Sequence, residues 1–185
     1  HSIYLHQLGF QVTGTDLSEN SITSAKKHEK PGLHFKVQDM CEPLDEKFDA
    51  VFNLFTSFGY FKEETNNLNT LKAIKAELKP GGYGVIDFMN AKKVIRELVA
   101  EDTKTVNGIK FHQKRWVENN FIFKQIDFED HGEHFSFTER VKALSLKDFK
   151  NYFDQAGIQL LNVFGDYQLQ DFDEENSDRL ILIFQ

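Results

Sequence analysis

The spacing of apolar positions predicts alternating strands and helices in the first half of the chain. Strand patterns occur in four segments, at residues 10–15, 33–37, 48–55 and 83–88. The third, FDAVFNLF, is almost entirely apolar, as expected of a strand buried on both faces. Apolar residues at helical spacing predict an amphipathic helix over 62–79. Two further helices are expected over 1–8, ending at Gly9, and over 18–28, beginning at Ser18.

The pattern changes in the second half, where three strands follow one another with short connections. They are expected at residues 109–117, 121–129 and 135–144. Because the turn signals Asn119-Asn120 and His131-Gly132-Glu133 separate them, the strands are antiparallel. Helices over 91–100 and 146–156 flank this meander, and strands are expected at 158–164 and 180–184. The order predicts an α/β layer fold interrupted by an antiparallel meander.

Composition narrows the classes of protein that this chain can be. Its 185 residues, 40% hydrophobic and 28% charged, suit a single globular domain. The net charge of −7 argues against a nucleic-acid partner, and no apolar run approaches the roughly 20 residues of a membrane span. The single cysteine, Cys41, excludes an internal disulfide and fits a reducing cytoplasm. The seven histidines lack metal-ligand spacing, so no metal site is expected.

Polar residues follow three of the predicted strands, where ligands bind in open α/β sheets. Asp16 ends the first strand, and its carboxylate can accept both hydroxyl hydrogens of a ribose. Asp39 ends the next and can accept from an adenine amine, with Leu17 and Met40 on either side of the ring. Asn53 lies near the end of the third. The alternative is that both aspartates only cap helices and start turns.

Four segments, in this order, resemble the motifs of class I S-adenosylmethionine-dependent methyltransferases. They are residues 12–22, 35–40, 48–60 and 78–88. The resemblance implies a Rossmann-like sheet with helices on both faces and S-adenosyl-L-methionine as the cofactor. It also implies that Asp16 holds the ribose, that Asp39 and Met40 meet the adenine, and that residues 53–55 (Asn53, Leu54 and Phe55) flank the methionine part.

The resemblance departs from the family at the amino-terminal end. The glycine-rich loop that follows the family's first strand, and lets the backbone approach the cofactor, is absent. Residues 1–9 resemble the helix that comes directly after that loop. We therefore expect residues 1–185 to be one methyltransferase domain that is incomplete at its amino-terminal end, with the first strand and the loop missing.

The meander, taken as residues 104–145, is expected to be an inserted substrate cap. Such inserts resemble those of small-molecule enzymes, including glycine-type and amino-sugar N-methyltransferases. Pairing the strands about Asn119-Asn120 places Trp116 opposite Phe123 and His112 opposite Asp127. These four side chains then share one face, on which Trp116 and Phe123 are candidate substrate contacts. A His112–Asp127 pair is a candidate catalytic base, and an exposed polar cross-strand pair is the alternative.

Further candidates come from residues able to reach a pocket. Tyr60 is the second candidate base. Arg115 and Arg140 are expected to clamp a carboxylate substrate or to be solvated charges, and Tyr167 is a further candidate for substrate contact. A hydroxyl acceptor would need a nearby base, whereas an amine only has to be deprotonated.

These observations predict a cytoplasmic enzyme that transfers a methyl group to a small-molecule N, O or C nucleophile. No nucleic-acid or membrane partner is expected, and the sequence leaves the oligomeric state open. Two alternatives stay open, a nicotinamide-dependent oxidoreductase of Rossmann type and a catalytically inactive methyltransferase-like binding module. The oxidoreductase accounts less well for Asp39-Met40 and for the Lys79-Pro80-Gly81-Gly82 turn.

Overall fold

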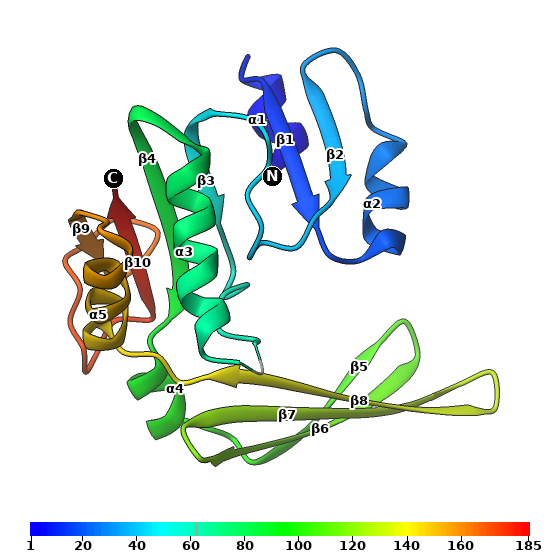
Figure 1. The fold of residues 1–185 in the computed structure, drawn as a ribbon. Coiled ribbons are helices and arrows are strands. Elements are labelled where there is room, and N and C mark those ends of the chain that lie inside the picture. Colours follow the sequence, from blue (N-terminus) through cyan, green and yellow to red (C-terminus); the bar gives the residue numbers. More distant parts are fainter. Residues whose placement is uncertain (62) are drawn as a thin grey trace.

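The computed structural model describes residues 1–61 and 63–185, and their strands form three sheets (Figure 1). The first contains β1 (Val12–Asp16) and β2 (Leu33–Val37), which run parallel in register from Val12–Leu33 to Asp16–Val37. Helices α1 (Ser2–Gln7) and α2 (Glu19–Lys26) accompany it. Ile22 of α2 packs on Leu33 and Phe35 of β2, forming a small separate core.

The second sheet has the strand order β3-β4-β10-β9. Its strands are β3 (Phe48–Asn53), β4 (Leu78–Met89), β10 (Arg179–Phe184) and β9 (Leu160–Phe164). Strands β3 and β4 are parallel, whereas β10 runs antiparallel to both of its neighbours. The carboxyl end of β4 therefore meets the amino end of β10, at the edge where β3 also ends.

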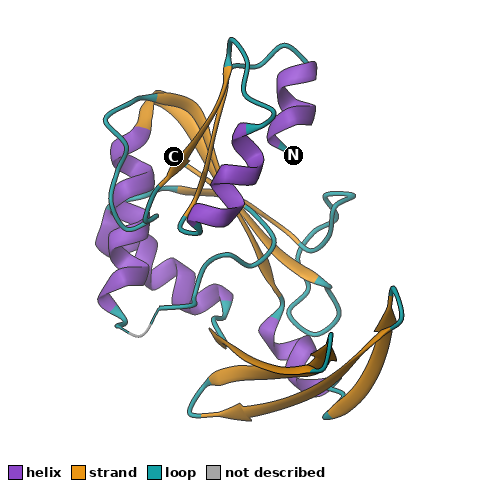
Figure 2. Ribbon diagram, turned by 90° about the vertical axis from the view of Figure 1, so that its right-hand side faces the viewer, coloured by secondary structure: helices purple, strands orange, loops and turns teal. Residues whose placement is uncertain are grey.

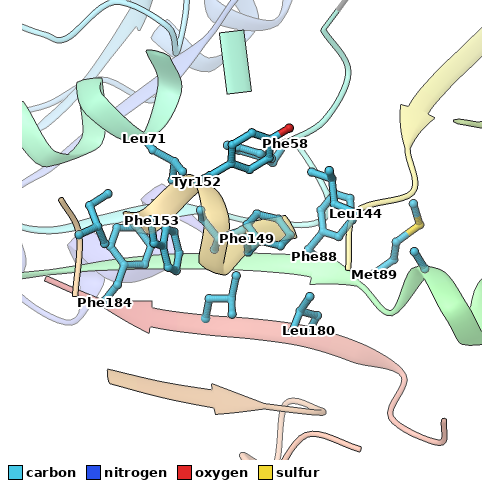
Figure 3. Packing of buried hydrophobic residues seen from close by; sticks show 14 of the residues in the cluster. Phe58, Leu71, Phe88, Met89, Leu144, Phe149, Tyr152, Phe153, Leu180 and Phe184 are labelled. Carbon is cyan, nitrogen blue, oxygen red and sulfur yellow. The ribbon is translucent and has the colours of Figure 1, made fainter. Parts of the chain in front are cut away.

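Two helices, α3 (Thr65–Glu77) and α5 (Leu146–Ala156), pack beside this sheet and contact each other. Phe149 and Phe153 of α5 meet Phe88 of β4 and Phe184 of β10 with ring centroids 4.8 to 5.3 Å apart (Figure 3). Helix α5 begins at a capping box between Ser145 and Asp148 and ends at Gly157, whose φ is +65°. Its sharp boundaries fix which residues of α5 enter the core.

The third sheet, called the cap sheet below, is antiparallel and has the order β5-β6-β7-β8. Its strands are β5 (Glu101–Val106), β6 (Ile109–Glu118), β7 (Phe121–Asp130) and β8 (Glu133–Lys142). They follow the short helix α4 (Ala91–Arg96). Figures 1 and 2 show this sheet beside the end of the molecule toward which the carboxyl ends of β1, β2 and β3 point.

Most predicted elements are confirmed, including the α/β class and the registers Trp116–Phe123 and His112–Asp127. The predicted helix over 62–79 is α3, which is shorter, and Lys62 lies outside the described residues. The predicted break at 79–82 is instead a register shift within β4. Among the described residues, no helix is both long and apolar enough to cross a membrane.

One prediction at the start of the meander was wrong. The helix expected over 91–100 ends at Arg96, and residues 101–106 form strand β5. Asn107-Gly108, with φ of +51° and +84°, is the two-residue turn that joins β5 to β6. This dipeptide is a strong hairpin signal, and it could have revealed the extra strand.

Candidate active site

Asp16 and Asp39 lie at the carboxyl ends of the adjacent parallel strands β1 and β2. Asp16 pairs with Val37, so Asp39 lies two residues beyond its partner. Each carboxylate accepts one local hydrogen bond, from the Ser18 amide at 2.8 Å and from the Cys41 amide at 2.9 Å. Both aspartates thus make the expected turns. Both are also exposed, and in each the second oxygen accepts no bond from the described part of the chain.

Three other predicted residues border these carboxylates. Leu17, 70% exposed, leaves an apolar side chain in solvent beside Asp16. The Asn53 amide nitrogen donates to the Met40 sulfur at 3.5 Å, which links the ends of β2 and β3. The Asn53 amide oxygen is buried and has no partner among the described residues. A buried unpaired acceptor is costly unless a bound group donates to it, so this arrangement fits a ligand rich in donors.

The backbone after β3 is strained. Phe55 and Thr56 have φ of +58° and +60°, a conformation that is uncommon outside glycine and that Thr, being β-branched, disfavours. The Leu54 carbonyl accepts from the Ser57 hydroxyl at 2.7 Å. The Phe55 ring, 54% exposed, lies 4.7 Å from the His1 ring. The predicted segment 53–55 is therefore held in an unusual turn at the edge where ligands bind.

A charged cluster that sequence analysis missed holds this turn. Asp87 of β4 is 2% exposed and pairs with Arg179 at 2.7 Å. Its carboxylate also accepts from the Phe55 amide at 2.9 Å and from the Tyr167 hydroxyl at 3.1 Å. The only signal in the sequence was an aspartate at the end of an otherwise apolar strand.

Tyr167, predicted to contact substrate, is thus anchored by its hydroxyl, while its residue as a whole stays 58% exposed. Partial burial raises the pKa of this hydroxyl, and the bond to Asp87 adds to the effect, whereas Arg179 opposes it. Tyr167 consequently stays protonated at neutral pH and donates to Asp87.

The two predicted bases have different surroundings. Burial and, secondarily, the charge of Glu139 raise the pKa of Tyr60, so its hydroxyl stays protonated at neutral pH. The His112 ring nitrogen lies 3.0 Å from the Thr103 hydroxyl. Asp127 accepts from the Gln125 amide at 3.0 Å, and hydrogen bonding to Ser136, followed by that to Gln125, lowers the pKa of Asp127. Although His112 and Asp127 are cross-strand neighbours, their side chains have different hydrogen-bond partners.

The predicted substrate residues on the cap sheet are divided between its faces. Trp116 and Phe123 stack with centroids 5.0 Å apart. Arg140 shares their face and donates to the Phe61 carbonyl at 3.0 Å. Arg115, one residue before Trp116, lies on the opposite face and pairs with Asp102 at 3.3 Å. Because the two arginines are on opposite faces, they cannot clamp one carboxylate together.

The face of the cap sheet opposite the Trp116–Phe123 stack contains a cavity of about 670 Å³ that the sequence did not predict. Phe111, Phe128 and Phe137 form its aromatic lining. The polar lining residues are Lys104, Gln113, Thr138 and Glu139. Val141, two residues after Glu139 and on the same face, lies in the buried core with Phe58, so this face adjoins the segment that follows β3. Its volume suits a small molecule.

Comparisons with known proteins agree with this geometry. A family model described as a methyltransferase domain matches residues 1–82. The putative methyltransferase YqeM of Bacillus subtilis is 28% identical over 177 residues, covering 90% of this chain and 72% of that protein. A dTDP-3-amino-3,4,6-trideoxy-alpha-D-glucopyranose N,N-dimethyltransferase of Streptomyces venezuelae is 30% identical over 163 residues. That match covers 80% of this chain and 66% of the relative.

Solved structures show the same fold. The crystal structure of an S-adenosylmethionine-dependent methyltransferase from Clostridium acetobutylicum superposes with a TM-score of 0.82 at 19% identity. The superposition covers 94% of this chain and 74% of the Clostridium chain. The predicted Rossmann-like architecture is therefore confirmed.

Proposed function

Because this chain belongs to the class I S-adenosylmethionine-dependent methyltransferases, we propose that it methylates a small-molecule N, O or C nucleophile. The cofactor, when bound, supplies an activated methyl group on its sulfonium. The chain's own residues have to bind that cofactor, orient the acceptor and exclude water. A likeness to an amino-sugar N,N-dimethyltransferase supports an acceptor of this size.

One observation carries the proposal: exposed carboxylates lie at the ends of two adjacent parallel strands, and beside them lies a buried amide oxygen that accepts no hydrogen bond from residues 1–61 or 63–185. In this proposal Asp16 accepts from the ribose hydroxyls and Asp39 from the adenine amine. Asn53, Leu54 and Phe55 flank the methionine part. Leu17 and Met40 supply apolar contacts to the adenine.

On the acceptor side, we assign the cap role to residues 104–145. The aromatic cavity supports binding of the acceptor on the face that carries Phe128 and Phe137. Tyr60 lies beside β8, an edge strand of the cap sheet, since its neighbours Gly59 and Phe61 accept hydrogen bonds from Lys142 and Arg140. Because its hydroxyl stays protonated, it would orient the acceptor as a hydrogen-bond donor. An amine that loses its proton to solvent needs no protein base. His112, on the other face, is the weaker of the two catalytic candidates.

The test has two stages. Calorimetric titration with S-adenosylhomocysteine and with NAD identifies the cofactor. Labelled S-adenosylmethionine is then incubated with pools of small amines, hydroxyl compounds and acids, and the products are separated by chromatography. Binding of S-adenosylhomocysteine together with a labelled product supports the proposal. Binding without a product from any pool favours an inactive binding module, and binding of NAD alone favours the oxidoreductase.

A further inference from the structure

We propose that Asp87 is a positioning residue for the cofactor site, because it holds the Phe55–Thr56 turn in its left-handed conformation. The inference rests on the cofactor site proposed above. Asp87 lies at the end of β4 and the turn lies at the end of the neighbouring parallel strand β3. Asp87 would therefore act on the cofactor through the segment 53–55, without touching it.

The turn needs an external support. Two consecutive residues other than glycine have positive φ, and each costs conformational energy that the surroundings must offset. Such strain persists where neighbouring groups over-determine the backbone. Neither Phe55 nor Thr56 can relax without losing the hydrogen bonds made by its own amide.

Asp87 accepts both of those amides. Its carboxylate accepts from the Phe55 N–H at 2.9 Å, and its main-chain carbonyl accepts from the Thr56 N–H at 2.9 Å. One residue of β4 thus fixes both strained residues, each through a different acceptor. The carboxylate acceptor depends on the side chain, so substitution of Asp87 removes it while the backbone contact to Thr56 stays available.

Arg179 makes the buried charge tolerable and extends the support. It donates from Nε to the Asp87 carboxylate at 2.7 Å, and its terminal nitrogen donates to the Thr56 hydroxyl at 3.2 Å. Tyr167 completes the set by donating to the second carboxylate oxygen. A neutral amide could not replace this carboxylate, because its NH₂ group would face donors on one side.

The experiment measures S-adenosylhomocysteine affinity by calorimetry for the protein and for Asp87→Asn, with thermal unfolding followed by circular dichroism. We expect affinity to fall by about 10-fold or more, the effect of losing a charge-assisted hydrogen bond. The control is Ile158→Ala, a cavity substitution in the main core at a residue that takes no part in the turn. Its destabilisation should leave the affinity unchanged.

A second substitution, which relieves the backbone strain, distinguishes a positioning role of Asp87 from a general effect on stability. Glycine adopts positive φ without strain, so Phe55→Gly, at the residue whose amide the carboxylate accepts, should lessen the need for Asp87. In the Phe55→Gly background, whatever its own affinity, Asp87→Asn is expected to reduce the affinity by a further factor of about 3 or less. An equal loss in both backgrounds would overturn the proposal, as would unchanged affinity in Asp87→Asn or an equal loss in Ile158→Ala.

If Asp87→Asn does not fold, Tyr167→Phe removes a single donor from the same carboxylate at an exposed residue. It is expected to lower the affinity by about 2- to 5-fold, because one hydrogen bond to the carboxylate is lost while those from Phe55 and Arg179 remain. An unchanged affinity would overturn the proposal. If the unsubstituted protein does not bind S-adenosylhomocysteine, the proposed function is contradicted as well. If it binds normally and these substitutions do not change the affinity, only the proposed role of Asp87 is contradicted.

Discussion

Trp116 and Phe123 stack across strands β6 and β7 with their ring planes only 3° from parallel. This pair lies on the face of the cap sheet opposite the cavity lined by Phe128 and Phe137. The sequence predicts substrate contact for the stacked pair, whereas the cavity favours the other face. The two faces can be distinguished by substitution.

Phe128→Ala should raise the KM for the acceptor by about 10-fold or more, because it removes an aromatic wall of the cavity. The affinity for S-adenosylhomocysteine should be unchanged, since the cofactor site lies on other strands. Steady-state kinetics with the acceptor found in the screen provide the measurement. Trp116→Ala is the matched substitution on the stacked face, and a larger KM increase there than in Phe128→Ala would show that the acceptor binds on that face.

Asp16→Asn should weaken S-adenosylhomocysteine binding by about 10- to 100-fold, because the proposed carboxylate accepts two ribose hydroxyls through charge-assisted bonds. Titration calorimetry at fixed ionic strength measures the change. Glu19→Gln removes an exposed carboxylate three residues along the chain and serves as the control. If both variants lose the same affinity, the effect is one of overall charge and the ribose assignment fails.

Tyr60→Phe should lower kcat by about 10-fold or less without altering the pH dependence of the rate below pH 9. Burial, with a smaller contribution from Glu139, raises the pKa of this hydroxyl, so it stays protonated across that range and acts only as a donor. Rate profiles between pH 6 and pH 9 test this. Disappearance of a titrating limb in the variant would instead identify Tyr60 as a base.

Lys142→Met should lower stability slightly at pH 7 and have no effect at low pH. Hydrogen bonds from Lys142 and then from Tyr152 lower the pKa of Glu64. A lowered folded-state pKa stabilises the protein above the unfolded value of about 4.3, and the contribution is lost as pH falls through the folded pKa. Because Glu64 is largely exposed, the effect at pH 7 should stay below about 1 kcal/mol.

Urea unfolding at pH 7 and at pH 3 gives this difference. Lys147→Met removes an exposed lysine from helix α5 and controls for the loss of charge. A destabilisation by Lys142→Met that is equal at both pH values would mean that packing of the lysine stem, and not the ion pair, is responsible.

Much of the fold follows from local patterns. Alternation about Asn119-Asn120 set the β6–β7 register, and Gly157 marked the end of α5. The two aspartates were found because each directly follows a strand, and the parallel register then brings Asp16 and Asp39 to the same edge.

Other features depend on long-range contacts that no local pattern reveals. Asp87 and Arg179 lie 92 residues apart in the chain, and no pattern in either segment indicates that they form a pair. The alternation of the cap strands likewise defines two faces but does not say which one adjoins the segment after β3. That information lies in contacts such as the one from Lys142 to the Gly59 carbonyl.

The three hairpin turns of the cap sheet have a consequence for folding. Asn107-Gly108, Asn119-Asn120 and His131-Gly132 all have positive φ at both residues, which matches the twist of the strands that they join. Every neighbouring pair of cap strands is therefore closed by a two-residue connection, and such hairpins form in about 1–10 μs. Strand β10, by contrast, pairs with residues of β4 that lie 90 or more positions earlier in the chain. We expect the cap sheet to fold early. The β3-β4-β10-β9 sheet should be completed last, when β10 pairs with β4.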